Sequence, residues 1–162
     1  MTTILVIEDD DIVRKLIRKI LTQQQYAVLE AAGGHQGVQL ALAHQPDLIV
    51  CDVMMPGISG FEVLKKLKQD ELTNYIPVVL LTAKTDVQSR ITGWTERADE
   101  YIEKPFNTEE LKVRIKNLLE IRALLRQRYQ QSFTAQLPDA REEAPEHKSI
   151  DTVNRQFMEK IN

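Results

Sequence analysis

Cysteine is almost absent from this chain of 162 residues, which contains only Cys51. A single cysteine cannot form a disulfide within the chain, so the disulfide-stapled scaffolds of small secreted proteins are excluded. The residues around Cys51 are those of a buried strand. We therefore expect Cys51 to be a small core residue in a reducing compartment.

An excess of positive charge is also missing. The chain has 21 basic and 24 acidic side chains and a net charge of −3, so it lacks the charge that a nucleic-acid footprint needs. No apolar run approaches the roughly 20 residues that span a bilayer, and Met1–Ile7 lacks the basic start of a signal peptide. We expect a cytoplasmic protein without membrane contact, which reaches nucleic acid only through an output domain outside this chain.

The length and the hydrophobic fraction of 43% allow one sizeable core. Short apolar runs rich in β-branched residues alternate with segments of helical periodicity five times. We expect strands near residues 4–7, 27–30, 48–51, 77–81 and 101–102. Helices between parallel strands are typical of a doubly wound α/β sheet.

Polar side chains gather where the predicted strands end. Glu8 and Asp9 follow the first strand, Asp52 the third, Thr82 the fourth and Lys104 the fifth. The carboxyl ends of parallel strands meet at one edge of a doubly wound sheet, so these side chains should share a pocket. Carboxylates suit Mg²⁺, and a hydroxyl and an ammonium group suit phosphoryl oxygens. This chemistry is that of phosphoryl transfer to a carboxylate.

Four sequence segments carry a specific resemblance: Ile4–Asp10, Asp52–Gly57, Leu81–Ala83 and Tyr101–Phe106. In this order and at these separations they resemble the signatures of the response-regulator receiver family, over residues 2 to about 120. The resemblance implies a flavodoxin-like, five-stranded parallel sheet of order 2-1-3-4-5. It also implies a phosphoacceptor switch of a two-component system, which takes its phosphoryl group from a sensor histidine kinase or a phosphotransfer protein and is not a turnover enzyme.

The resemblance assigns roles to the residues of the pocket. Asp52 would accept the phosphoryl group, Asp9 would bind Mg²⁺ directly, Glu8 would bind it through water, and the backbone carbonyl of Met54 would be a further ligand. Glu8 stands where aspartate is commoner in the family, and its extra methylene leaves open whether its own metal contact is direct.

Three further residues and one departure complete these expectations. Thr82 and Lys104 would bind the phosphoryl oxygens, and Tyr101 would turn inward on activation. Arg97 stands where a helix-ending glycine is frequent, so the end of the fourth helix is expected to shift.

The pocket residues are also compatible with different roles. Acids such as Glu8 are often helix caps, and Asp52 alone could cap a turn. A Mg²⁺ phosphatase of the haloacid-dehalogenase type also uses a strand-end aspartate, but it wants a second carboxylate two residues later, where this chain has Met54. A flavin or nucleotide carrier would want backbone amides and bases at the strand ends rather than acids.

The pattern changes after Asn107, which is expected to cap a helix of about 25 residues. Residues 137–149 have the composition of a linker. We expect a receiver domain at 1–120 and a helical extension with a linker at 121–162, which weakly resembles the junction before AraC-type output domains. This favours truncation before an output domain, with transcription as one output and a stand-alone regulator or a fusion to a kinase or cyclase as alternatives.

An apolar stripe on the long helix would be free to pair with a second copy of the chain. Its residues recur at steps of three or four: Leu118, Ile121, Leu125 and Tyr129. We expect a homodimer that depends on phosphorylation, formed through the fourth helix, the fifth strand and this long helix.

Overall fold

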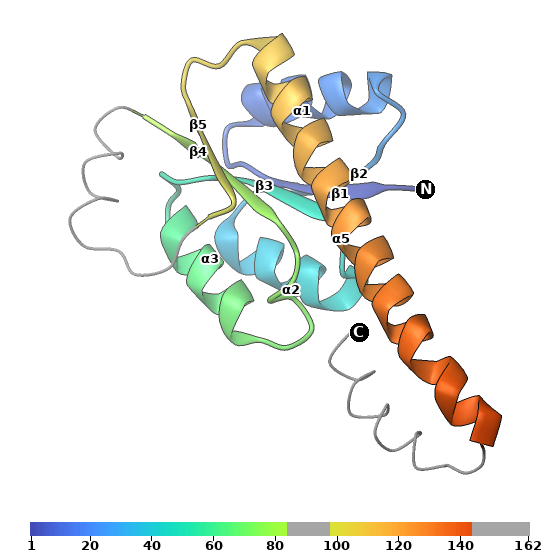
Figure 1. Cartoon of the computed structure of the whole chain (residues 1–162). Helices are drawn as coiled ribbons and strands as arrows, with labels where there is room; N and C mark the ends of the chain where they lie inside the picture. Colours follow the sequence, from blue (N-terminus) through green and yellow to red (C-terminus); the bar gives the residue numbers. More distant parts are fainter. Residues whose placement is uncertain (84–97, 144–162) are drawn as a thin grey trace. The chain divides into compact units, whose positions relative to one another are not determined.

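The computed structural model describes residues 1–83 and 98–143, with side chains as far as Arg128. Its sheet has five parallel strands in the order β2-β1-β3-β4-β5 (Figure 1). The strands are β1 (Thr3–Ile7), β2 (Ala27–Ala31), β3 (Leu48–Asp52), β4 (Val78–Thr82) and β5 (Glu100–Glu103). The predicted fold class and strand order are therefore confirmed.

Helices cover both faces of the sheet. They are α1 (Asp11–Gln23), α2 (Gly34–His44), α3 (Gly60–Gln69) and α5 (Thr108–Glu143). In Figure 1, α2 and α3 lie on one side of the sheet, and α1 and the start of α5 lie on the other. Alternate residues of β1 face these two sides: Leu5 packs with the first pair of helices and Ile4 with the second. Strands β3 and β4 are buried along their whole length, as strands covered on both faces should be.

Side-chain caps set the starts of the helices. The Asp10 carboxylate accepts hydrogen bonds from the amides of Ile12 and Val13, and Ser59 forms a capping box with Glu62 at the start of α3. Asn107 accepts from the Glu109 amide at 2.7 Å, so its predicted capping role is confirmed. These caps fix the loops that follow β1 and β3, where the polar residues gather.

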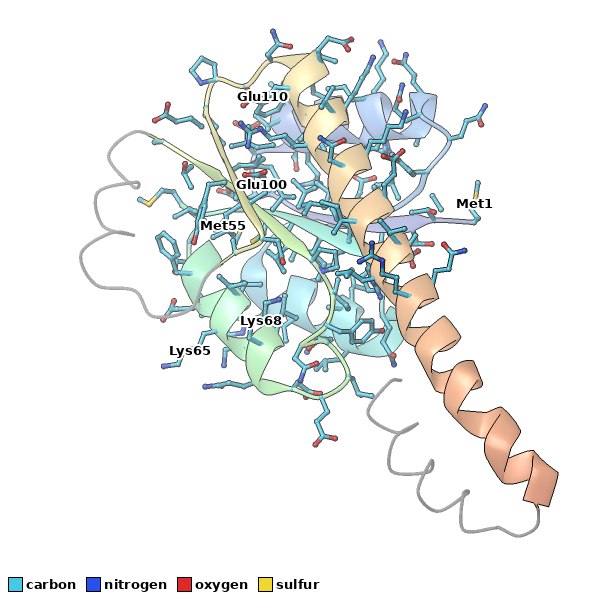
Figure 2. All side chains as sticks on the ribbon, viewed as in Figure 1. Met1, Met55, Lys65, Lys68, Glu100 and Glu110 are labelled. Atoms are coloured by element: carbon cyan, nitrogen blue, oxygen red, sulfur yellow. The ribbon has the colours of Figure 1, made fainter. Side chains whose placement is uncertain are left out.

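Ion pairs tie the fifth strand to its neighbours. Arg114 of α5 bonds both Glu100 of β5, at 2.8 Å, and Glu110, at 3.2 Å; Figure 2 labels the two acids. On the other side of the sheet, Lys68 of α3 lies 3.7 Å from Asp99, whose carboxylate accepts the Val78 amide. The start of β5 is thus attached to a helix on each face of the sheet.

The C-terminal part of the chain differs from one expectation. Helix α5 continues to Glu143, so residues 137–143, expected as the start of a linker, are helical. Alanine, arginine and glutamate at 140–143 have high helix propensity, whereas Pro138 in the same stretch lacks the amide that a helix interior uses. The chain divides into two compact units, Met1–Leu119 and Glu120–Asn162.

Some expectations fall on residues that the structure does not describe. The predicted fourth helix and the departure at Arg97 lie outside the described ranges, as does the second part of the expected linker. Within those ranges, no helix has both the length and the apolar character needed to cross a membrane.

Candidate functional site: a carboxylate pocket at the strand ends

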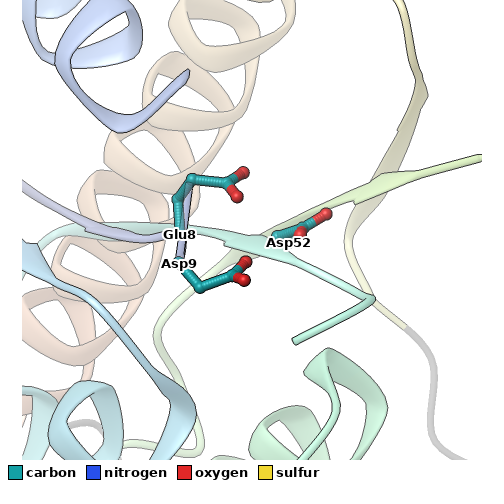
Figure 3. A group of neighbouring side chains, drawn as sticks. All are labelled: Glu8, Asp9 and Asp52. Carbon is teal, nitrogen blue, oxygen red and sulfur yellow. The ribbon is translucent and has the colours of Figure 1, made fainter. Parts of the chain in front are cut away.

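The register of the sheet brings three carboxylates together. Ile7 at the end of β1 pairs with Cys51 of β3, so Glu8 and Asp52 follow side by side, with Asp9 next in the chain. One oxygen from each of these three acids lies within 4.8 Å of the others, and the carboxyl groups face a common space (Figure 3). Glu8 and Asp52 are buried, whereas Asp9 is exposed. The predicted cluster of acids is therefore present.

Lys104 reaches two of these acids from the end of β5. Its Nζ lies 2.7 Å from Oδ1 of Asp52 and 3.6 Å from Oε1 of Glu8. The backbone helps to hold it there, because the amide of Lys104 donates to the carbonyl of Thr82 at 2.7 Å. The lysine thus compensates part of the negative charge that burial of Asp52 and Glu8 would leave unpaired.

Burial and mutual repulsion shift the titration of the pocket. Burial, opposed by a hydrogen bond from the Asp10 amide and reinforced by the charge of Asp52, raises the pKa of Glu8 to about 7. Burial also raises the pKa of Asp52, although Lys104 opposes the shift. Burial by itself lowers the pKa of Lys104, but its bonds with Asp52 and Glu8 raise it overall. The metal-free pocket is therefore short of positive charge.

Two buried oxygens near this pocket lack a hydrogen-bond partner among the described residues. They are Oε1 of Glu8 and Oγ1 of Thr82, and both residues are about 1% exposed. A buried polar atom without a partner costs free energy, so a water, an ion or a ligand commonly satisfies such atoms. A buried carboxylate oxygen without a hydrogen-bond donor, beside Asp9 and Asp52, fits a hard divalent cation such as Mg²⁺, and the Thr82 hydroxyl fits an anion's oxygen.

The other two predicted residues are more exposed than Glu8 and Asp52. Met54 follows Asp52 by two positions, and the residue is 65% exposed. Tyr101 in β5 is half-buried, and its hydroxyl accepts a hydrogen bond from the Ala98 amide at 3.1 Å. The metal role of the Met54 carbonyl and the switching role of Tyr101 stay predictions.

One residue of the site could not be found from the sequence pattern. The side chain of Arg14 in α1 is only 14% exposed, and it donates to the backbone carbonyl of Glu8 at 2.8 Å. The available signal was its position three residues after Asp11, a spacing at which opposite charges meet on a helix. That spacing reveals the ion pair with Asp11 but not the contact with Glu8.

The comparison with known families decides the assignment. The family model of the response regulator receiver domain matches residues 4–116. The chain belongs to this receiver domain family. Receiver domains act as phosphoacceptor switches in two-component systems and bind Mg²⁺ at an acidic site. The resemblance drawn from the four sequence segments is thus confirmed, and the match favours a switch over the phosphatase and carrier alternatives.

Individual receiver-containing relatives differ in what surrounds the domain. The chain is 38% identical over 159 residues to "Histidine kinase P4" of Formosa agariphila, covering 98% of this chain and 11% of the kinase. It is 42% identical over 119 residues to the "DNA-binding dual master transcriptional regulator RpaA" of Synechocystis, covering 74% of this chain and 49% of the regulator. The chain therefore spans about half the length of these relatives or less.

A solved receiver domain gives a parallel for the metal. The receiver domain of sensor histidine kinase PA1611 from Pseudomonas aeruginosa has a magnesium ion coordinated in its active site cleft. It is 25% identical to this chain with a TM-score of 0.68, over 74% of this chain and 98% of that domain. A receiver domain with the same fold as this chain can thus hold Mg²⁺ in its active site cleft.

Proposed function

We propose that this chain is a phosphorylation switch in which Asp52 accepts a phosphoryl group from the phosphohistidine of a partner kinase or phosphotransfer protein. The observation that carries the proposal is the environment of Asp52. Its Oδ1 lies 2.7 Å from Nζ of Lys104, at the end of a fully buried strand and beside two more carboxylates. This arrangement combines a nucleophile, a metal-binding cluster and a positive charge.

Mg²⁺ would be held by Asp9 and Asp52, with Glu8 and the backbone carbonyl of Met54 as further ligands. When bound, it supplies positive charge beside the phosphoryl oxygens. Oε1 of Glu8 supports this assignment, because it is buried without a hydrogen-bond donor and a cation nearby would stabilise it. Since a small, strongly hydrated cation rarely takes more than one or two carboxylates directly, Glu8 fits a contact through water.

The protein's own groups account for the transfer. A carboxylate oxygen of Asp52 attacks phosphorus, the bond from phosphorus to the donor's imidazole nitrogen breaks, and the imidazole leaves with the electron pair. Lys104 and the unpartnered hydroxyl of Thr82 donate to the phosphoryl oxygens, where negative charge gathers. The product is an acyl phosphate on Asp52, which makes the chain its own substrate rather than a turnover enzyme.

The same contacts suggest how the signal leaves the site. A phosphoryl group on Asp52 gives Lys104 a stronger partner than Glu8 and gives the Thr82 hydroxyl an acceptor. Thr82 would move toward the new group, and Tyr101 would turn inward by releasing the Ala98 amide. The change would be read at the surface that includes β5 and α5.

The output of the switch is proposed to be transcription, through an output domain outside this chain, in a cytoplasmic signalling pathway. The relation to a DNA-binding regulator supports this role. A second candidate is a receiver within a larger sensor kinase. It is favoured by the similarity to a histidine kinase, which extends over 98% of the chain and so includes residues beyond the receiver match at 4–116.

The decisive experiment treats the protein with acetyl phosphate and Mg²⁺ and measures the added mass of about 80 Da that one phosphoryl group contributes. Wild type should be modified, and Asp52→Asn should not. Asp70→Asn is a matched control, because its remaining side-chain oxygen can still accept the Leu72 amide as Oδ1 of Asp70 does. Equal phosphorylation of Asp52→Asn and wild type would refute the assignment, and steady hydrolysis of p-nitrophenyl phosphate would favour a phosphatase.

A further inference from the structure

Arg14 bonds three different residues through three separate nitrogen atoms, and one of these residues is Glu8, in the loop that carries the carboxylates. Nη1 donates to the backbone carbonyl of Glu8 at 2.8 Å, Nη2 to Oδ1 of Asp11 at 2.6 Å, and Nε to Oε1 of Glu30 at 3.2 Å. A guanidinium group is rigid and planar, so three bonds in different directions leave it little freedom. The side chain is 14% exposed, and Asp11, followed by Glu30, raises its pKa.

The carbonyl that Arg14 holds belongs to the peptide between Glu8 and Asp9. Because a peptide unit is planar, fixing the direction of the carbonyl also fixes the amide of Asp9 and the directions in which both residues leave the peptide. The amide of Glu8 is held as well, since it donates to the carbonyl of Ala31 at 3.0 Å. The backbone around the two candidate metal ligands is therefore held at both sides of Glu8.

The other partners of Arg14 connect its side chain to two elements of the fold. Glu30 lies in β2, the strand next to β1, and Asp11 is the first residue of α1. Arg18, one turn further along α1, bonds the other carboxylate oxygen of Glu30 at 3.1 Å. The two arginines thus share one anchor, but the bond to the Glu8 carbonyl comes from Arg14.

From this geometry we propose that Arg14 is a positioning residue of the metal site, which holds the peptide between Glu8 and Asp9 so that both carboxylates face Asp52. The inference rests on the proposed function, because it concerns the same Mg²⁺ site. It adds a residue that does not touch the cation and lies outside the four segments that resemble the family.

Electrostatic repulsion and ligand positioning predict opposite effects of removing Arg14 on Mg²⁺ binding. A guanidinium near a cation site repels the cation, so a neutral side chain at this position should tighten Mg²⁺ binding. If Arg14 instead positions the ligands, its removal should weaken binding, as loss of a group that orients metal ligands commonly costs about tenfold or more. The sign of the change therefore separates the two effects.

The test measures the Mg²⁺ dissociation constant by titration calorimetry for the full chain and for Arg14→Met, Arg14→Gln, Arg14→Lys and Arg18→Met. We expect about tenfold weaker binding in the two neutral Arg14 variants. Arg14→Lys should recover part of the affinity, because it keeps a donor for one acceptor. Arg18→Met is the matched control, which removes the same charge and a bond to the same Glu30, and should bind as tightly as wild type or more tightly.

Two further measurements distinguish positioning from a general loss of structure. Urea unfolding in EDTA identifies the variants that fold, and either neutral variant can decide the question if the other does not. The carbonyl carbon resonance of Glu8 in the metal-free protein should shift in the Arg14 variants and stay in place in Arg18→Met, because the hydrogen bond to that carbonyl is lost only in the former.

The possible failures are separable. Unchanged or tighter binding in folded Arg14→Met, or an equal weakening in Arg18→Met, overturns the positioning role and leaves the proposed function intact. Absence of Mg²⁺ binding by the wild type, together with absence of beryllofluoride binding, refutes the metal site and the positioning role with it.

Discussion

The Nζ of Lys104 lies 2.7 Å from Oδ1 of Asp52, and the two groups come from the ends of strands that are not neighbours in the sheet. Strand β4 lies between β3 and β5, and its last residue, Thr82, accepts the amide of Lys104. The contact thus joins three strand ends at the residue proposed to carry the phosphoryl group.

Replacing Lys104 with methionine should slow the reaction of the protein with acetyl phosphate by on the order of 100-fold. The substitution removes the positive charge beside Asp52 and a donor to the phosphoryl oxygens. Phosphorylation can be followed by intact mass. Lys65→Met is the control, since Lys65 is exposed on α3 and should be replaceable without effect. Equal rates in all three proteins would mean that the ion pair plays no part in the transfer.

Asp9→Asn should weaken Mg²⁺ binding more than Glu8→Gln does. A direct ligand loses an ionic contact, whereas a ligand acting through water loses a hydrogen bond, so we expect losses on the order of 100-fold and 10-fold respectively. Calorimetry measures both. A larger loss in Glu8→Gln would show that the longer side chain of Glu8 reaches the ion itself.

The stability of the metal-free protein should fall as pH rises from about 4.5 to about 7, because Glu8 is protonated more readily in the folded state than in the unfolded state. The pKa of Glu8 is raised from 4.5 to about 7 in the folded protein, so across this window the folded state retains a proton that the unfolded state has lost. The free energy of unfolding therefore falls as pH increases, by on the order of 1–3 kcal/mol. Urea unfolding in EDTA should show this slope in wild type and in the exposed control Glu71→Gln, but a smaller slope in Glu8→Gln.

Gly60→Ala should destabilise the protein by about 1–3 kcal/mol and slow phosphorylation of Asp52. An added Cβ would collide with the backbone carbonyl of Asp52 and lie 2.8 Å from the Cα of Val53, and backbone atoms cannot rotate away as a side chain can. At Gly33 an added Cβ would meet no atom within 4 Å, so Gly33→Ala should cost less. Chemical unfolding of the two variants gives the comparison, and equal stability of the two would contradict the expected clash.

Phosphorylation should promote self-association through α5. Ile121, Leu124 and Leu125 are 54%, 50% and 58% exposed, and pairing with a second chain would remove such side chains from water. A bias of only about 1.4 kcal/mol changes the dimerisation constant tenfold. Light scattering should detect a larger mass with beryllofluoride and Mg²⁺ in wild type but not in Leu125→Asp.

Gln127→Asp is the control for this experiment, because it adds the same charge two residues away, on a different face of the helix. It should associate as wild type does. If the mass of every sample is the same over a wide concentration range, α5 does not mediate dimerisation and its exposed apolar side chains serve another contact.

The arrangement of strands, helices and pocket acids was within reach of the amino-acid sequence. Runs such as Ile4–Ile7 are apolar at every position rather than at alternate positions, and this local pattern identifies a strand covered on both faces. Once the strands are parallel, polar residues that follow them must lie at one edge of the sheet. For that reason Glu8, Asp9 and Asp52 were expected together, and one oxygen from each does lie within 4.8 Å of the others.

Only the tertiary structure decided which of these groups pair and what each pairing does to its charge. Lys104 bonds Asp52, and Arg14 bonds the Glu8 carbonyl, so each contact joins residues from separate elements or loops. The burial of Glu8, which raises its pKa to about 7, likewise depends on how these elements pack. Periodicity reports the face of an element on which a residue lies, but distances between side chains depend on strand register and rotamers, which are set by packing across the whole domain.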